Sequence, residues 1–205
     1  MSLFILNPFS PKQDAPHDPL VNFNGTTGND YIVGNAQDNR IVGGGGHDLL
    51  LGGAGNDMLK AGHKASSLYG GAGDDLLIGG RGSDHLNGGD GEDRLNGRAG
   101  DDILVGGPGL DWLVGGPGRD TFLYRDISDS IPESADWIVD FVSGKDKIDL
   151  SALTHGSGLT YVEKFTGQAR EAVLGYDLTV DFDGDGVADF RVMTVGQAVQ
   201  TDIVA

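Results

Sequence analysis

The 205-residue chain contains no cysteine, few aromatic residues and few basic residues. Without cysteine, disulfide bonds and thiolate metal sites are excluded. Acidic residues outnumber basic residues 31 to 14, and the formal net charge is −17. This charge argues against nucleic acid and anionic membrane surfaces as partners, because both require a basic protein surface. No stretch approaches the ~20 apolar residues of a transmembrane segment.

Motifs of hydrolytic enzymes are also missing. None of the five histidines is followed by glutamate, so there is no H-E-x-x-H zinc motif, and there is no G-x-S-x-G nucleophile elbow. We therefore expect no enzymatic activity from this chain, and we expect the repeat residues His47 and His85 to be solvated. The histidines are His17, His47, His63, His85 and His155.

A nine-residue repeat dominates the sequence that remains. High net charge with low hydrophobicity usually indicates disorder, but from Gly25 to Leu123 the chain forms eleven blocks of nine without an insertion. Seven blocks begin Gly-Gly-x-Gly-x-Asp, whereas the blocks at Gly34 and Ala61 are degenerate. Every block has an apolar residue at position eight: Ile32, Ile41, Leu50, Leu59, Leu68, Leu77, Leu86, Leu95, Leu104, Leu113 and Phe122.

Each block combines a short strand with a tight turn. The last three residues are expected to form a strand whose apolar position eight points inward. The six before them must reverse the chain, and glycine permits the positive φ values and close backbone contacts that this needs. The turn ends in an aspartate. Carboxylates and backbone carbonyls are the oxygen ligands that Ca²⁺ prefers, so the repeat predicts calcium sites.

The blocks resemble the hemolysin-type calcium-binding (RTX) repeat. The resemblance implies a parallel β-roll with two blocks per coil and with ions between the turns of successive coils. Position six then forms two columns, and each pair of successive aspartates in a column predicts one site. The pairs in the first column are Asp30/Asp48, Asp84/Asp102 and Asp102/Asp120, and those in the second are Asp57/Asp75, Asp75/Asp93 and Asp93/Asp111.

Six ions would reduce the formal charge from −17 to −5 and would relieve self-repulsion. Two further pairs, Asn39/Asp57 and Asp111/Asp129, would raise the number of ions to seven or eight. Asn39 offers a neutral oxygen. Asp129 belongs to a twelfth block by register, residues 124–132, which lacks the glycines.

The fifth block, residues 61–69, interrupts the first column because Ser66 replaces the aspartate. We expect no full calcium site at 48/66 or 66/84. Lys64 could supply the missing positive charge, but we favour simple sequence drift in a coil that tolerates it.

The C-terminal third has a different composition and a second resemblance. Residues 136–151 follow the pattern DxIxDFxxGxDxIDLS, and residues 188–196 alternate apolar and polar residues as a half-buried strand does. These stretches and the ending Thr-Asp-Ile-Val-Ala205 resemble the C-terminal region of serralysin-type secreted metalloproteases. The resemblance implies an uncleaved C-terminal signal for a type I secretion system. We expect antiparallel strands that cap the open end of the roll.

The sequence thus predicts an extended arm over residues 1–24, a calcium-binding β-roll over 25–132 and a C-terminal β cap with the secretion signal over 133–205. The Leu3–Leu6 run is too short for a cleaved signal peptide. Residues 181–189 have the acid spacing of an EF-hand loop but lack its glutamate at position 12; we favour an acidic turn there.

Outward apolar residues on one sheet are predicted to form a contact patch for the N-terminal arm around Leu3–Phe9, which we favour, or for another copy or a target protein. The patch consists of Tyr31, Val33, Leu49, Leu51 and Tyr69.

We interpret the chain as a secreted, extracellular and non-catalytic calcium-binding protein, exported by the type I secretion apparatus and folded by Ca²⁺ outside the cell. It would be an effector or binding module. The alternative is an RTX and secretion module that works with a separate protease, lipase or alginate-modifying catalytic chain.

Overall fold

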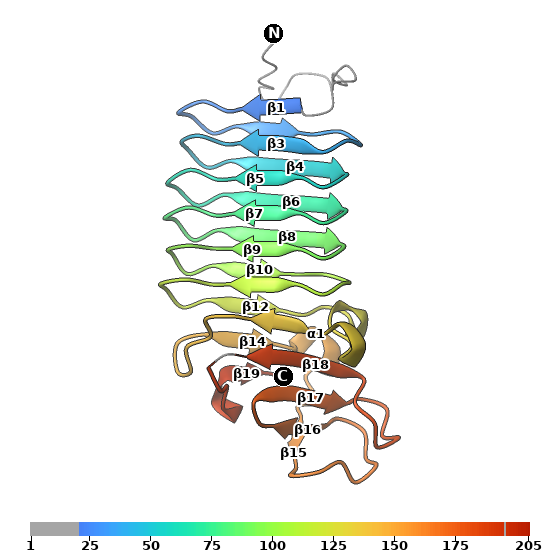
Figure 1. Ribbon diagram of the computed structural model, residues 1–205. Helices are drawn as coiled ribbons and strands as arrows, with labels where there is room; N and C mark the ends of the chain where they lie inside the picture. The colour runs from blue at the N-terminus through green and yellow to red at the C-terminus, as the bar shows by residue number, and fades with distance from the viewer. Residues whose placement is uncertain (1–20, 195) are drawn as a thin grey trace.

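The computed structural model describes residues 21–194 and 196–205. The chain winds as a stack of flat coils, and each coil contributes one strand to each of two facing parallel sheets (Figure 1). The structure confirms the predicted β-roll. The first sheet contains β1 (Val21–Asn24), β3 (Asn39–Val42), β5 (Met58–Lys60), β7 (Leu76–Ile78), β9 (Arg94–Asn96) and β11 (Trp112–Val114). The second contains β2 (Tyr31–Val33), β4 (Leu49–Ala54), β6 (Ser67–Ala72), β8 (His85–Asp90), β10 (Ile103–Val105) and β12 (Thr121–Leu123).

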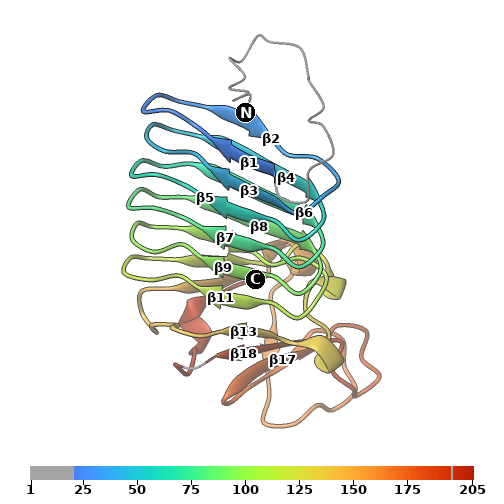
Figure 2. The ribbon, with the colours of Figure 1, turned by 45° about the horizontal axis from the view of Figure 1, so that its top comes forward.

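Successive strands of each sheet pair in parallel with an offset of two blocks. Ile41 lies opposite Leu59 in the first sheet, and Leu50 lies opposite Leu68 in the second. One coil therefore contains two nine-residue blocks, as the resemblance to the RTX repeat implies. The turns of the coils form the two long edges of the roll, and Figure 2 shows these edges on either side of the stacked strands.

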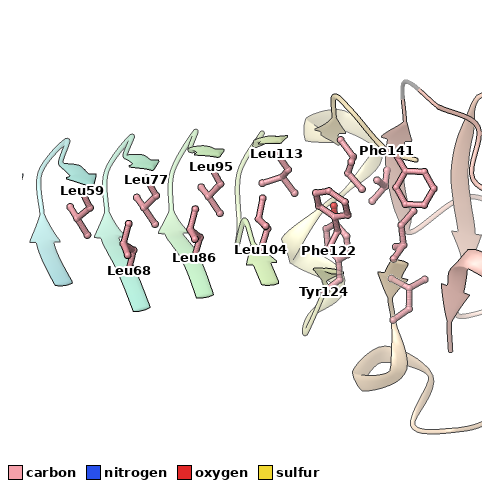
Figure 3. Packing of buried hydrophobic residues seen from close by; sticks show 14 of the residues in the cluster. Leu59, Leu68, Leu77, Leu86, Leu95, Leu104, Leu113, Phe122, Tyr124 and Phe141 are labelled. Atoms are coloured by element: carbon pink, nitrogen blue, oxygen red, sulfur yellow. The ribbon is translucent and has the colours of Figure 1, made fainter. Parts of the chain in front are cut away.

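The position-eight side chains form the core. Leu59, Leu77, Leu95 and Leu113 from the first sheet face Leu68, Leu86, Leu104 and Phe122 from the second across the interior (Figure 3). All eight side chains are at most 1% exposed. Complete burial of such a side chain stabilises the fold by about 1.5–3 kcal/mol. Each strand of the roll contributes one side chain to the core, so each further coil adds two residues to it.

The second glycine of the repeat is required by the close stacking of turns. Gly53 and Gly71 have φ values of +124° and +126°, which non-glycine residues rarely adopt. A Cβ atom on Gly71 would lie 1.9 Å from the carbonyl oxygen of Gly53. The degenerate fifth block keeps Gly62 for the same reason, since a Cβ atom there would lie 1.9 Å from the carbonyl oxygen of Gly44.

The roll extends beyond Gly25 toward the N-terminus. Val21–Asn24 forms β1, which pairs with β3, and Phe23 takes the inward place with 9% of its surface exposed. Four residues of the predicted arm thus belong to the first sheet. The rest of that arm, including the predicted contact of Leu3–Phe9 with the patch, lies outside the described residues.

After β12, the chain leaves the nine-residue register but not the roll. The predicted twelfth block instead contains a short 3-10 helix, η1 (Ile127–Asp129), and a second one, η2 (Pro132–Ser134), begins at its last residue. The next strands are β13 (Asp136–Ile138), which pairs with β11, and β14 (Lys147–Asp149), which pairs with β12. A short helix, α1 (Ser151–Thr154), follows.

The C-terminal strands close the end of the roll, as the sequence predicts. β16 (Glu171–Leu174), β17 (Asp177–Asp181) and β18 (Phe190–Thr194) form antiparallel pairs, and β18 extends the first sheet beyond β13. β15 (Thr160–Tyr161) is the last strand of this sheet, and β19 (Ile203–Val204) pairs with β14 in the second. Phe190 is fully buried and packs edge to face against Tyr124, with 5.0 Å between the centroids of the two rings.

Among the described residues, we find no helix with the length and apolar character that spanning a membrane would require.

Candidate calcium sites

The position-six residues stack in two columns, one along each turn edge. The backbone N–H of each aspartate donates to Oδ1 of the aspartate one coil further on, 18 residues later in the chain. In the second column, Asp57 donates to Asp75 and Asp75 donates to Asp93, both at 2.7 Å. The remaining predicted pairs are joined in the same way: Asp30/Asp48, Asp84/Asp102, Asp102/Asp120 and Asp93/Asp111.

The second carboxylate oxygen, Oδ2, has no such partner at most positions of the columns. Within the described part of the chain, eight of these oxygens are buried and accept no hydrogen bond. Buried carboxylate oxygens without a partner are rare in folded proteins because their desolvation is not compensated. The eight belong to Asp48, Asp57, Asp75, Asp93, Asp102, Asp111, Asp120 and Asp136.

Backbone oxygens converge on the same space as Oδ2. A Cβ atom on Gly70 would lie 2.1 Å from Oδ2 of Asp75 and 2.6 Å from the carbonyl oxygen of Gly88 in the next coil. A Cβ atom on Gly52 would meet Asp57 Oδ2 and the Gly70 carbonyl oxygen at 2.3 and 2.5 Å. An all-oxygen set of carboxylates and carbonyls, enclosed between two turns, suits a hard cation such as Ca²⁺. The residues therefore fit the implied metal.

Burial makes these carboxylates resist ionisation when no cation is bound. It raises the pKa of Asp57, Asp93 and Asp120 to about 7. In each case the N–H bond from the previous coil lowers the pKa, and neighbouring carboxylates raise it further. Burial likewise raises the pKa of Asp75 and Asp102 to about 6 and that of Asp111 to about 8. A cation between the turns would reverse this shift.

Three members of the columns differ from the others because their side-chain oxygens accept hydrogen bonds within their own turns. Oδ2 of Asp30 accepts hydrogen bonds from the N–H of Thr26 at 2.7 Å and from its hydroxyl at 3.0 Å. Oδ2 of Asp84 accepts one from the N–H of Gly80 at 2.5 Å. Asn39 is engaged within its own turn, because its Oδ1 accepts from Asn35 N–H at 2.7 Å and its Nδ2 donates to the carbonyl of Gln37 at 2.5 Å.

Ser66 preserves the stacking of the first column without the charge. Its Oγ accepts a hydrogen bond from the N–H of Asp48 at 3.1 Å, and its own N–H donates to Asp84 Oδ1 at 2.7 Å. The fifth block thus supplies the backbone ladder but no carboxylate. The absence of a full calcium site at 48/66 and 66/84 stays a prediction.

The continuation of both columns differs from the sequence prediction. Asp111 donates its N–H to Asp136 at 3.0 Å, and Asp120 donates to Asp146 at 3.0 Å. Asp129 lies instead in η1, where its Oδ2 accepts from the N–H groups of Arg125 and Asp126. The paired aspartates are separated by 25 and 26 residues here instead of 18. A fixed nine-residue register therefore could not predict Asp136 and Asp146 as column members. The shared pattern Asp-x-Ile at 136–138 and 146–148 was the available signal.

The acidic loop between β17 and β18 brings three carboxylates together. One oxygen from each of Asp181, Asp183 and Asp189 lies within 4.8 Å of the others. Oδ1 and Oδ2 of Asp181 accept hydrogen bonds from Gly184 and Gly186 at 2.6 and 2.8 Å. The backbone N–H groups of the loop thus satisfy both oxygens of the buried Asp181 carboxylate, and the acidic turn stays an interpretation.

The predicted apolar patch lies on the outer face of the second sheet. Tyr69 is 38% exposed, and its ring lies 5.6 Å from that of His85. The other members, Tyr31, Val33, Leu49 and Leu51, are half-buried. The patch as a protein contact site remains a prediction.

Residues 17–205 match the family model of the peptidase M10 serralysin C-terminal domain. The chain belongs to this family. Metallopeptidase AprA of Pseudomonas marginalis is 57% identical over 91 residues, which cover 41% of this chain and 19% of that protein. Serralysin A of Dickeya chrysanthemi is 42% identical over 88 residues, which cover 40% of this chain and 19% of that protein. The chain therefore matches about a fifth of the length of these relatives.

Among solved structures, the chain is similar to the AlgE6R3 subunit of the Azotobacter vinelandii mannuronan C5-epimerase. The two share 32% sequence identity with a TM-score of 0.48, over 64% of this chain and 78% of that structure.

Replacing Asp75 with asparagine should remove the charge shared by the pairs 57/75 and 75/93. We expect up to two fewer bound ions and a folding midpoint that needs roughly tenfold more calcium. The amide oxygen of the new side chain would still accept the N–H bond of Asp57, so the turn itself should persist. Isothermal titration calorimetry with Ca²⁺ measures the stoichiometry.

Asp74→Asn is the matched control. Asp74 is the preceding residue of the same turn, is exposed, and accepts the N–H of Glu92 at 3.0 Å. This substitution removes the same charge outside the column, so the number of bound ions should not change. An equal loss of bound ions in the two variants would contradict ligation by Asp75.

In chelator, acidification should stabilise the folded roll. The pKa values of about 6 to 8 lie above the ordinary value of 3.8, so the folded chain binds more protons than the unfolded chain between these limits. Their contribution is fully present below about pH 4 and is lost as the pH rises through 6 to 8. Circular dichroism in EDTA should therefore show a β-rich signal near pH 4 that decreases as the pH rises through 6 to 8, where the chain becomes largely unfolded. A β-rich signal that grows as the pH rises would contradict the assignment.

Proposed function

We propose that this chain is a calcium-binding RTX protein that folds on Ca²⁺ after type I secretion and has no catalytic activity in its own residues. The six aspartate pairs predicted from the sequence bind the ions, and Asp111/Asp136 and Asp120/Asp146 extend the two columns. The observation that supports calcium most directly is the set of buried Oδ2 atoms without hydrogen-bond partners. A bound divalent cation compensates their desolvation and keeps them ionised.

Calcium then acts as a switch for folding. Without it, stacked carboxylates repel one another and the net charge of −17 favours an open chain. Sites of this kind in extracellular modules bind calcium at roughly 10⁻⁴–10⁻³ M, far above cytosolic levels. The chain stays open during export through the type I apparatus, with an uncleaved C-terminal signal, and folds in the extracellular medium. The binding free energy of the ions contributes to the folding free energy.

Far-UV circular dichroism at neutral pH tests this directly. In chelator, we expect the spectrum of a largely unfolded chain, and millimolar calcium should produce a β-rich spectrum with cooperative melting. Magnesium at the same concentration is the control, since its octahedral preference and reluctance to dehydrate disfavour this site. A β-rich protein that melts cooperatively in chelator would refute the switch.

A second candidate function follows from the coverage of the relatives. The matched segment is about 19% of metallopeptidase AprA, so this type of domain occurs within larger proteases. In this alternative, the chain works with a catalytic partner. Affinity capture from culture supernatant of the source organism in calcium, followed by mass spectrometry, should then recover a protease, lipase or alginate-modifying chain. Recovery of no such chain, or equal recovery in chelator, would favour the first function.

A further inference from the structure

The two turn edges of the roll differ in charge. The edge that follows the first sheet, here called the basic edge, contains the turns at residues 43–48, 61–66, 79–84, 97–102 and 115–120. The opposite edge, with the turns at 34–39, 52–57, 70–75, 88–93 and 106–111, has no basic residue and has four acids besides the column. Those acids are Asp38, Asp74, Asp90 and Glu92. The basic edge has Asp101 as its one acid outside the column, and it has His47, His63, Lys64, Arg81, Arg98 and Arg119.

A groove of about 540 Å³ runs along the basic edge where it meets the first sheet. Its lining includes Lys60, His63, Arg81 and Arg98 and no acidic residue. In a chain of net charge −17, an acid-free groove with four basic side chains is a strong local exception. Charge of one sign in a concave surface attracts ligands of the opposite sign.

The basic side chains follow the axis of the roll. Lys60 ends β5 and His63 lies in the turn that follows it, while Arg81 and Arg98 lie in the turns of the next two coils. Adjacent strands of a sheet are ~4.8 Å apart, so the groove presents cationic groups that recur with the coils. The matching ligand is an extended chain with anionic groups at a similar repeat.

The interrupted fifth block lies in this groove. Ala61, Gly62 and His63 line it, and they belong to the block in which Ser66 replaces the column aspartate. The column residue of this block, Ser66, lines a separate pocket with Asp48 and Asp84. The interruption of the column and the acid-free lining of the groove are therefore two separate features of the fifth block.

We propose that this groove binds an acidic polysaccharide with one carboxylate per sugar ring, lying along the axis of the roll. The guanidinium groups of Arg81 and Arg98 match planar carboxylates, and Val42, Ala61 and Pro117 provide apolar contacts for the sugar rings. A single-stranded nucleic acid fits less well, because the groove has no tyrosine, tryptophan or phenylalanine on which bases could stack.

The proposal rests on the proposed function in one respect. The aspartate column belongs to the same turns as the groove, since Asp84 accepts a hydrogen bond from the N–H of Gly80 in the groove lining, and bound calcium would cancel the negative charge of the column. Ligand binding is therefore expected in the calcium-loaded protein. Circular dichroism reports folding separately from binding, so failure of the groove and failure of the calcium switch give different results.

Fluorescence anisotropy with labelled short oligogalacturonates, in millimolar calcium, tests the groove. We expect saturable binding that weakens with salt and is lost for the methyl-esterified oligomer, which keeps the sugar chain without the charges. Arg81→Gln with Arg98→Gln should weaken binding about tenfold. Arg94→Gln with Lys164→Gln, two exposed residues outside the groove lining, removes the same charge and should leave the affinity within about twofold of the original.

Several results would overturn the proposal in protein whose β-rich spectrum is unchanged. The first is that the esterified oligomer binds as tightly as the charged oligomer. The second is that both double variants lose the same affinity, and the third is that single-stranded DNA binds more tightly than the oligogalacturonate. Self-association seen by sedimentation, and abolished by the groove variant, would assign the groove to the acidic edge of a second copy. If the chain is already folded in chelator, the calcium switch fails, and the same titration in chelator still measures whether the groove binds.

Discussion

Repulsion between stacked, buried carboxylates is the interaction on which the rest of this structure depends. Most coils place an aspartate at each of their two edges, held by an N–H bond from the preceding coil, and most of these aspartates have a second oxygen that is buried and unpaired. Burial raises the pKa of Asp57 and Asp93 to about 7, so the fold needs either protons or a cation at these positions. If calcium fills these positions, as proposed, the ion content of the medium determines whether the chain is compact.

The remainder of the architecture serves this stacking. Glycines allow turns to approach until carbonyl and carboxylate oxygens converge, and the single leucine per strand gives each coil a small core of its own. Each coil of a solenoid contacts only the coils next to it, so the last coil would expose its apolar core and the unpaired edges of its strands. Here β18 covers that end, and the buried pair of Tyr124 and Phe190 joins the cap to the roll.

The periodic part of the fold could be predicted from the sequence, because a fixed nine-residue count determines inward and outward positions. The two blocks per coil that the RTX resemblance implies then determine the column pairs. Prediction failed where that count ended. Asp136 and Asp146 continue the columns after longer connections, and Asp129, placed by register, lies in η1. The hydrogen bonds to Oδ2 of Asp30 and Asp84 could not be predicted from the repeat, because they depend on the positions of individual atoms in the turns. The basic groove has no signal in the repeat, because Lys60, Arg81 and Arg98 stand at different positions of different blocks and only the stacking of the coils brings them together.

The interruption at Ser66 also affects the mechanics of the roll. Across the same coils the opposite column is complete, with Asp57, Asp75 and Asp93 in succession. If ions occupy the aspartate pairs, these coils are cross-linked along one edge and held along the other by hydrogen bonds of Ser66 alone at position six. The two edges then differ in stiffness, and bending of the roll concentrates at the fifth block, with the ion-bound edge as its pivot.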